Sequence, residues 1–384
     1  MIYLDHNATT QPLPAAVQAM SECLLEDWGN PSSMHTRGMA AKHRLNRARG
    51  QVAALLDASP AEIVFTGGAT ESNHTAILGA LALAVAHPGK RRIVASRVEH
   101  PATLALLAHL ERQGFRIAWL EVDGSGRIDP ADIEAALTPD TALLTMMWAN
   151  NETGVLFPVD RAAVMAKARG VLFHTDAVQA AGKVEVDMTR TPADLLSLSA
   201  HKLHGPPGVG ALFVRKGLAL PPLLFGHQER QRRGGTENLP GIVGFGVAAE
   251  HLAATWRDQA PRLAALREQF ERGLRARLPM VRINGGDAAR LCNTSNFAID
   301  GLDAEALLDR LDKAGIFASS GSACTAGGTE PSHVLRAMGQ TREAALAAVR
   351  ISFGRGNTAA EVNRLLELLP AIAVAFPGSL ATAA

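Results

Sequence analysis

The sequence predicts an α/β protein with a mostly parallel sheet of seven strands and, beyond it, a smaller α+β domain. Two observations carry this prediction. Short apolar runs alternate with amphipathic stretches over residues 62–214, which is typical of a parallel sheet covered by helices on both faces. Near Pro240 a long alanine- and leucine-rich stretch begins, followed by fewer strands and helices. We expect a large domain at 14–255 and a small domain made of 1–13 and 256–384.

Seven apolar runs bounded by turn residues are the expected strands of the large sheet. In chain order they are Glu62–Thr66, Ile93–Ser96, Phe115–Val122, Thr141–Trp148, Val171–His174, Leu195–Leu198 and Val209–Val214. The amphipathic stretches between them predict helices at Thr70–Val85, Pro101–Gln113 and Arg161–Arg169. One long helix is expected over about 241–277, with Pro261 as a candidate break. The small domain is expected to hold two strands and two helices, at Asn296–Ile299, Val349–Phe353, Ala304–Ala314 and Ala359–Ala373.

Composition excludes several classes of protein. The formal net charge of +1 gives no electrostatic reason to bind nucleic acid or an anionic membrane. The three cysteines, Cys23, Cys292 and Cys324, include no C-x-x-C pair, so neither a structural zinc nor a dithiol is expected, and their odd number suits a reducing compartment. No apolar stretch reaches the roughly 18 residues of a membrane span, and the N-terminus lacks a signal-peptide pattern. We therefore expect a cytoplasmic protein without a metal site.

The run Ser319–Gly328 places Cys324 among serine, glycine, alanine and threonine. Such residues bury little apolar surface, so a mobile loop is expected at about 319–330. A free cysteine is usually a small buried hydrophobe, and its reactivity accounts for the exceptions. By itself the loop favours a reactive thiol and a merely tolerated one about equally.

A glycine turn follows the strand that ends at Thr66, with Gly67 and Gly68 directly before Ala69 and Thr70. This arrangement exposes N–H groups at a positive helix end and lets a phosphate approach the backbone. The alternative is an ordinary strand-to-helix turn with Thr70 as N-cap, which this motif alone favours. A nucleotide P-loop is not expected, because the G-x-x-x-x-G-K-[ST] pattern is absent.

Four further polar residues follow other predicted strands. Lys202 can form a Schiff base where its surroundings lower its pKa, although an isolated lysine is usually a surface residue. Asp176 can keep a pyridinium nitrogen protonated, or it can cap a helix. His100 taken alone is more often structural than catalytic, and Asn151 fits ordinary turn chemistry.

The coincidence of these motifs at the ends of five strands discriminates between the alternatives. In an open parallel sheet, the carboxyl ends of the strands form the ligand crevice. A phosphate cradle, a lysine, an acid, a histidine and an asparagine therefore converge there. This set matches pyridoxal phosphate enzymes better than metal, nucleotide or serine-hydrolase enzymes, whose motifs do not follow a strand in this sequence.

Nearly the whole chain resembles the cysteine desulfurases of the class V aminotransferase family, the group that includes the nitrogen-fixation and housekeeping iron–sulfur enzymes. The motifs that carry the resemblance are Tyr3–Thr10, Gly29–Ser33, Phe65–Ser72, Ser319–Cys324, Glu330–Arg336 and Val349–Ser352. The resemblance implies the aspartate aminotransferase-like fold of pyridoxal phosphate-dependent transferases, with a large domain and a small α+β domain.

The resemblance also implies how the cofactor, pyridoxal 5′-phosphate, is bound. Lys202 is expected to bind it as a Schiff base. Asp176 is expected to pair with the pyridine nitrogen, and Gln179 with the phenolate oxygen of the ring. His100 is expected to stack on the ring and to assist proton transfer.

The phosphate and the substrate have implied partners of their own. The phosphate is expected to contact Ala69, Thr70, Ser199 and His201. Thr236 is expected to reach the phosphate of the neighbouring subunit, which implies a homodimer. Asn151 and Arg350 are expected to hold the substrate carboxylate, Arg350 through a planar bidentate pair.

The implied reaction removes sulfur from L-cysteine. The freed amine of Lys202 takes the Cα proton while the cofactor ring accepts the electrons. The thiolate of Cys324 then attacks the substrate sulfur and becomes a persulfide, and L-alanine is released. Loop mobility would let the sulfur reach a protein acceptor, such as an iron–sulfur scaffold or a thiolation enzyme.

Three features depart from the family pattern or refine it. Ala200 stands where close relatives are expected to have glycine, so its backbone is a place to look for strain. The long cysteine loop resembles the nitrogen-fixation and housekeeping group. The chain ends soon after its last predicted helix, without the longer tail that housekeeping members use to dock scaffolds, which weakens the case for a scaffold as acceptor.

Two alternative functions stay open at this point. The first is another enzyme of the same fold, such as a selenocysteine lyase or a transaminase, because the fold alone does not decide the activity. Cys324 argues against a transaminase, which needs no thiol. The second alternative is a non-catalytic sulfur carrier or scaffold, which would have no use for the lysine, aspartate and histidine set.

Overall fold

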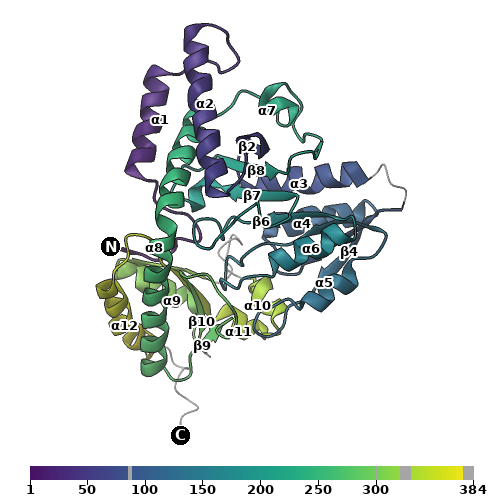
Figure 1. Cartoon of the computed structure of the whole chain (residues 1–384). Coiled ribbons are helices and arrows are strands. Elements are labelled where there is room, and N and C mark those ends of the chain that lie inside the picture. Colours follow the sequence, from purple (N-terminus) through teal and green to yellow (C-terminus); the bar gives the residue numbers. More distant parts are fainter. Residues whose placement is uncertain (85–88, 300, 321–329, 375–384) are drawn as a thin grey trace.

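A computed structural model describes residues 1–84, 89–299, 301–320 and 330–374 of the protein. Its largest sheet has seven strands, in the order β2 (Ile63–Thr66), β8 (Gly210–Val214), β7 (Leu195–Ser199), β6 (Leu172–Asp176), β5 (Thr141–Thr145), β3 (Arg92–Ser96) and β4 (Arg116–Leu120). β8 is antiparallel to β2 and β7, and the other neighbouring pairs are parallel. The α/β class and the mostly parallel sheet of seven strands are confirmed (Figure 1).

The strand ends differ from the prediction by a few residues, most clearly at β5. The strand predicted to reach Trp148 ends at Thr145. Two residues later, the N–H of Met147 would face β3 if the ladder continued. It instead donates to the side-chain carboxyl group of Glu99 at 2.8 Å. A buried side chain therefore replaces the neighbouring strand as hydrogen-bond acceptor and ends the pairing.

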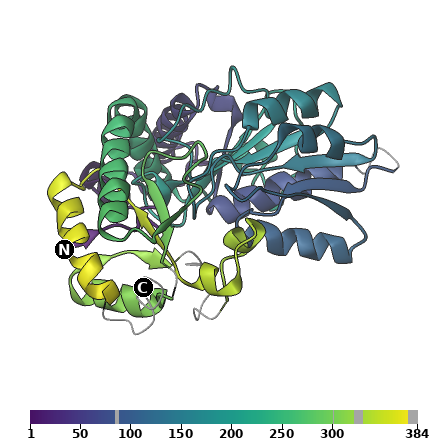
Figure 2. The ribbon, with the colours of Figure 1, turned by 90° about the horizontal axis from the view of Figure 1, so that it is seen from below.

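Alternate side chains of the central strands enter two hydrophobic layers. Ile93 and Leu143 pack with α3 (Ala69–Ala84) and α4 (Pro101–Arg112). Their neighbours Val94 and Leu144 pack on the opposite face, with α2 (Thr36–Leu55), α5 (Pro130–Ala136) and α6 (Val159–Ala168). This alternation follows from the pleat of a strand, and Figure 2 shows the resulting helical layers on the two sides of the sheet.

The helix α8 (Leu239–Arg277) is 39 residues long and continuous, so the candidate break at Pro261 is wrong. A proline inside a helix removes one hydrogen bond and crowds the preceding turn. Here tertiary packing holds the helix on both sides of the proline. Its first half lies along α1 (Pro14–Glu26) and α2, and its second half buries Leu263 and Phe270 against the C-terminal part of the chain, including α12 (Ala359–Val374).

The C-terminal part forms an α+β unit with its own hydrophobic cluster. Its antiparallel sheet has the order β12 (Ser319–Ser320), β13 (Ala348–Ser352), β10 (Thr294–Ala298) and β9 (Arg282–Asn284), and α9 (Ala304–Lys313) packs beside it. The N-terminal strand β1 (Ile2–Tyr3) joins this unit by pairing in parallel with β11 (Ile316–Phe317). The small α+β unit was expected, whereas the boundaries at 14–255 and at 1–13 plus 256–384 stay a prediction.

Short helices complete the described chain. They are η1 (Pro60–Glu62), η2 (Ala200–Lys202), α7 (Gln228–Gln231), α10 (His333–Ala337) and α11 (Arg342–Leu346). Within the ranges that the structure covers, no helix is both long and apolar enough to cross a membrane.

Candidate active site

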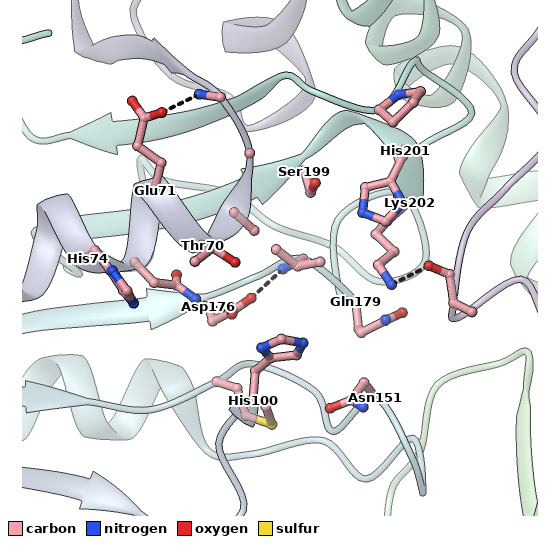
Figure 3. A pocket seen from close by; sticks show the side chains of 18 of the residues that line it. Thr70, Glu71, His74, His100, Asn151, Asp176, Gln179, Ser199, His201 and Lys202 are labelled. Atoms are coloured by element: carbon pink, nitrogen blue, oxygen red, sulfur yellow. Dashed lines mark hydrogen bonds between the residues drawn. The ribbon is translucent and has the colours of Figure 1, made fainter. Parts of the chain in front are cut away.

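A cavity of about 890 Å³ opens where the parallel strands of the large sheet reach their carboxyl ends. With the exception of Thr236, every predicted site residue in the described part of the chain lines this cavity: Ala69, Thr70, His100, Asn151, Asp176, Gln179, Ser199, His201, Lys202 and Arg350. Figure 3 shows Thr70 and Ser199 on one side of Asp176, and His100 and Asn151 on the other. Residues far apart in the sequence meet here because parallel strands end at the same edge of a sheet.

The turn between β2 and α3 forms the expected phosphate cradle. Because α3 begins at Ala69, Thr70 lies within the first turn and is not an N-cap. Gly68 has φ +150°, and a Cβ built there would meet nothing within 4 Å, so the backbone conformation rather than the space requires glycine. The first N–H groups of a helix lack acceptors within the helix, and here they line the cavity, where a phosphate can accept from them.

Lys202 is the last residue of η2, the short turn that follows β7. Its ammonium donates to the main-chain oxygens of Asn7 and Ala8, at 2.5 and 2.6 Å. These two carbonyl groups come from the N-terminal segment and hold the lysine nitrogen at the wall of the cavity. The arrangement suits a lysine whose amine reacts inside the cavity and whose ammonium form is held by main-chain acceptors.

Asp176, at the end of β6, is a buried carboxylate. Its Oδ2 accepts from Nδ2 of Asn73 at 2.7 Å, and its Oδ1 accepts from the N–H of Val178 at 3.0 Å. No helix follows it directly, so the alternative of a helix cap is wrong, although the bond to Val178 is a local turn bond. Two neutral donors orient the carboxylate and leave its negative charge available to a cationic ring nitrogen.

His100 is the N-cap of α4, and its Nδ1 accepts from the N–H of Ala102 at 3.2 Å. Burial lowers the pKa of His100, Asp176 opposes this effect, and Lys202 adds to it. The ring is therefore neutral near pH 7. Because Nδ1 accepts a bond, the neutral tautomer carries its proton on Nε2.

Ser199 is the last residue of β7, and His201 follows it in η2, directly before Lys202. His201 is neutral at pH 7, because burial and the nearby charge of Lys202 lower its pKa to about 4. Its Nδ1 lies 3.2 Å from the hydroxyl of Thr9. Ala200 is not among the described residues with a left-handed backbone, so the strain looked for at this position is absent.

Arg350, on β13, is the largest fully buried side chain in the described part of the chain, with 2% exposure. Its Nη1 donates to the main-chain oxygen of Asn151 at 3.0 Å. Its Nε lacks a hydrogen-bond partner. Arg350 also lines the cavity, and each of its terminal nitrogens carries a second hydrogen, so the guanidinium suits a substrate carboxylate.

The sequence motifs did not assign roles to the N-terminal residues that close the cavity. The main-chain oxygen of Asn7 accepts from Nε2 of Gln179 at 2.9 Å as well as from Lys202. The Asp5 carboxylate accepts from Arg350. Main-chain acceptors leave no trace in side-chain identity, and the only signal in the sequence was the resemblance of Tyr3–Thr10 to the family pattern.

Thr236 and Cys324 are the two predicted site residues not found at the cavity wall. Thr236 is exposed in the segment after α7, where the preceding Arg233 is held by an ion pair with Glu71 at 2.9 Å. Cys324 lies outside the described residues.

The family assignment follows from comparison of the whole sequence. Residues 2–365 match the family described as Aminotransferase class-V. The chain therefore belongs to the class V aminotransferase family, whose members depend on pyridoxal phosphate.

Within that family the chain is similar to cysteine desulfurases. It is 51% identical to the cysteine desulfurase of Gluconacetobacter diazotrophicus, over 97% of this chain and 93% of that protein. It is 52% identical to the enzyme of Cereibacter sphaeroides, over 97% and 95%.

Solved structures agree with this assignment. A NifS-like protein superimposes with a TM-score of 0.89 at 35% identity, covering 97% of this chain and 98% of that one. DndA from Streptomyces lividans superimposes with a TM-score of 0.78 at 36% identity, covering 90% and 97%. The predicted fold of pyridoxal phosphate-dependent transferases is confirmed.

The residues of the cavity fit pyridoxal phosphate. The N-terminus of α3 offers backbone donors to a phosphate, Asp176 offers a buried carboxylate to a ring nitrogen, and Lys202 offers an amine. The cavity of about 890 Å³ is also large enough for a cofactor together with a small amino acid.

Proposed function

We infer that the protein is a pyridoxal phosphate-dependent cysteine desulfurase. It converts L-cysteine to L-alanine and passes the sulfur, as a persulfide on Cys324, to a protein acceptor. The observation that carries this inference is the placement of Lys202, Asp176 and Arg350 around one cavity. The identity of about half with enzymes named cysteine desulfurase, over nearly the full chain, supports the same substrate.

The cofactor would be held from four sides. Ala69, Thr70, Ser199 and His201 would bind its phosphate. Asp176 would pair with the ring nitrogen, Gln179 with the phenolate oxygen, and His100 would stack on the ring. When bound, pyridoxal phosphate supplies an electron-withdrawing ring that stabilises negative charge at the substrate Cα.

Lys202 is the group that moves the Cα proton. Its amine takes the proton from the substrate, and the ammonium that results is held by the main-chain oxygens of Asn7 and Ala8. Neutral His100, with its proton on Nε2, can donate to the substrate without bringing a second cation beside Lys202.

Arg350 and Asn151 orient the substrate by its carboxylate. The guanidinium is already fixed by Asn151 and Asp5 before any substrate binds. Because Arg350 also lines the cavity, its guanidinium can donate to the carboxylate that enters. Pre-organisation of this kind lowers the entropy lost on binding.

Cys324 would accept the sulfur. Its thiolate attacks the substrate sulfur: an S–S bond forms, the C–S bond breaks, and the electron pair stays with the substrate carbon, which is protonated and leaves as alanine. The described residues on both sides of the loop support this role. Ser319 pairs with Arg350 in the sheet, and the hydroxyl of Ser332 donates to Glu152, the residue after Asn151. Both ends of the loop are therefore tethered beside the carboxylate site.

A homodimer is part of the proposal. A band of exposed apolar side chains on α1, α2 and the turn between them, which we call the apolar band, consists of Val17, Leu24, Leu25, Trp28, Met34 and Met39. A second exposed group, Leu223–Phe225, borders the cavity through Leu223 and Leu224. Exposed apolar surface of this extent is typical of a protein interface. A second copy that covers both groups would lie beside the cavity, where the family resemblance predicts that its Thr236 contacts the phosphate.

The proposal also includes the location of the enzyme in the cell and the class of its sulfur acceptor. We place the enzyme in the cytoplasm. Its acceptor is a protein that takes persulfide sulfur for iron–sulfur cluster assembly or for thiolation.

The proposal is tested by incubating the purified, cofactor-loaded protein with L-cysteine and a thiol reductant, and measuring alanine, sulfide and persulfide on Cys324. Equal amounts of alanine and sulfide are expected. C324A should bind the cofactor normally but form little alanine, and C23A, which removes a buried cysteine outside the cavity, is the matched control. Alanine formation by C324A at the wild-type rate would overturn the persulfide role.

Faster release of selenide than of sulfide from matched substrates would favour a selenocysteine lyase. Light scattering tests the dimer, and a fully active monomer would contradict it.

A further inference from the structure

The side chain of Gln179 is held at both ends of its amide. Nζ of Lys183 lies 3.0 Å from Oε1 of Gln179 and 3.1 Å from the main-chain oxygen of the same residue. On the other side, Nε2 of Gln179 donates to the main-chain oxygen of Asn7 at 2.9 Å. An ammonium group has donors only, so the amide oxygen must face Lys183. The amide nitrogen then lies toward Asn7, which lines the cavity.

We propose that Lys183 is a positioning residue that fixes the Gln179 amide with its nitrogen toward the phenolate oxygen of pyridoxal phosphate. The proposal rests on the role given to Gln179 in the proposed function. The amide nitrogen has two hydrogens. One of them is used by Asn7, and the second is available to the cofactor. The opposite orientation would set the amide oxygen against the phenolate oxygen, and two acceptors repel each other.

The same contacts connect Lys183 with the lysine that binds the cofactor. The main-chain oxygen of Asn7 accepts from both Gln179 and Lys202, at 2.9 and 2.5 Å. Lys183, Gln179, Asn7 and Lys202 therefore form one continuous hydrogen-bonded network. Figure 3 shows Gln179 beside the end of Lys202 at the wall of the cavity. A change in the orientation of the Gln179 amide would therefore directly change the hydrogen bonds at the cofactor site.

Lys183 also brings a positive charge into this network. The pKa of Lys183 is lowered to about 8, chiefly by burial, with Lys202 and Arg350 acting in the same direction and Cys292 opposing them. The ammonium form therefore still predominates near pH 7, as the donor role requires. A charge behind Gln179 polarises its amide and strengthens the bond from Nε2 to an anionic oxygen.

The substitution K183M tests the proposal, because methionine keeps an unbranched chain of similar length but has neither donor nor charge. The first readout is the pKa of bound pyridoxal phosphate, taken from its visible absorbance across pH. It should rise by about one unit, because a donor to the phenolate and a nearby cation both disfavour the protonated cofactor. The second readout is the dissociation constant of pyridoxal phosphate from the apoprotein, which should increase about tenfold, as expected for the loss of one hydrogen bond to a charged group.

Two variants serve as controls. K183R keeps a charged donor and should restore most of the wild-type absorbance pKa. K216M removes an exposed lysine outside the cavity and should change neither readout. Circular dichroism and the thermal midpoint establish that each variant is folded. Should K183M not fold, K183Q, which lacks the charge, carries the same comparison.

The variant Q179L separates a failure of this proposal from a failure of the proposed function. A shift of the absorbance pKa in Q179L together with an unchanged value in folded K183M would overturn the positioning role of Lys183 and leave the role of Gln179 intact. Unchanged values in both variants would overturn both roles. Wild-type protein that binds no pyridoxal phosphate would overturn the proposed function itself. A rise in both variants, reversed in K183R, is the result expected.

Discussion

Oδ1 of Asp5 lies 2.7 Å from Nη2 of Arg350, joining residues that are 345 positions apart in the chain. Nη1 of the same guanidinium donates to the main-chain oxygen of Asn151. Both terminal nitrogens of this buried arginine thus have a fixed partner, and Asp5 and Asn151 together set the plane of the group. Asp5 is therefore a positioning residue for the arginine that we assign to the substrate carboxylate.

The substitution D5N should weaken substrate binding more than it slows the chemical steps. Asparagine keeps the shape of the side chain and one acceptor oxygen, but it loses the charge that holds Arg350. We expect KM for L-cysteine to rise about tenfold, the effect of one charge-assisted hydrogen bond, with a smaller change in kcat. Steady-state alanine formation measures both constants. D309N, in an exposed ion pair with Lys313, is the control, and an unchanged KM in D5N would show that Arg350 does not need Asp5.

The substitution K202A should abolish the visible absorbance of the bound cofactor. This absorbance requires the covalent bond between an amine of the protein and pyridoxal phosphate, and Lys202 is the lysine held at the cavity wall by Asn7 and Ala8. Cofactor is added to the purified variant and the unbound excess, whose aldehyde also absorbs near the visible, is removed before the spectra are recorded. K167A, in which a lysine on α6 is removed, should keep the wild-type spectrum. A visible band retained in K202A means that a different amine binds the cofactor.

The sequence allowed prediction of the residues that follow parallel strands. Lys202 and Asp176 each come within a few residues of the end of an apolar run, and the rule that parallel strands end at one edge of the sheet was enough to predict that they meet. The same rule says nothing of Asn7, whose contribution is a main-chain oxygen. It also says nothing of Lys183, because this residue lies four positions after Gln179 in a turn, and only the folded chain shows that the two side chains meet.

The pairing of Glu229 with Arg49 could not be predicted from the sequence either. Glu229 belongs to α7, where three successive residues, Glu229, Arg230 and Gln231, have left-handed φ values of 47°, 58° and 65°. No glycine marks this turn, so local sequence gave no reason to expect it. The turn is held by long-range contacts: the carboxylate of Glu229 accepts from Arg49 and from the N–H of Phe65.

The substitution E229Q should therefore destabilise the protein strongly. Arg49 and Glu229 are both buried, and their two hydrogen bonds measure 2.6 and 2.5 Å. Glutamine cannot pair with both guanidinium nitrogens, and it leaves a buried positive charge uncompensated, which costs about 3–5 kcal/mol. The strained turn of α7 also loses the contact that offsets its unfavourable backbone conformation. Thermal and urea unfolding of the variant measure the effect.

Two comparisons make this prediction specific. E185Q changes an exposed glutamate that pairs with Arg190 and Arg257, and it should alter stability by less than about 1 kcal/mol. The double variant R49M/E229Q removes the uncompensated charge and should recover part of the loss. A double variant as unstable as the sum of the two single variants would contradict the ion-pair explanation.

The buried carboxyl of Glu99, next to His100, should give the protein a measurable dependence of stability on pH. Glu99 is 1% exposed, and its Oε1 accepts from the hydroxyl of Ser96 and from the N–H of Met147. Burial raises the pKa of Glu99 from 4.5 to about 8, Asp176 adds to the rise, and the two hydrogen bonds oppose it. Between these two values the folded protein keeps a proton that the unfolded chain has lost. The contribution of Glu99 to stability must therefore fall as pH rises from about 5 to about 8, whereas buried histidines such as His201, whose pKa is lowered to about 4, contribute in the opposite direction below about pH 6.5.

The substitution E99Q should remove much of this dependence, because glutamine has the shape and hydrogen-bonding groups of a protonated glutamate. Relative to E99Q, the wild-type protein should lose stability on the order of 3 kcal/mol between about pH 5 and pH 8. Glu152, whose pKa burial raises to about 7, acts in the same direction, so some slope remains in the variant. Thermal midpoints measured across this pH range give the comparison. Parallel curves for the two proteins would mean that Glu99 is ionised in the fold, and Ser96 and Met147 would then be stabilising a buried anion beside the cofactor site.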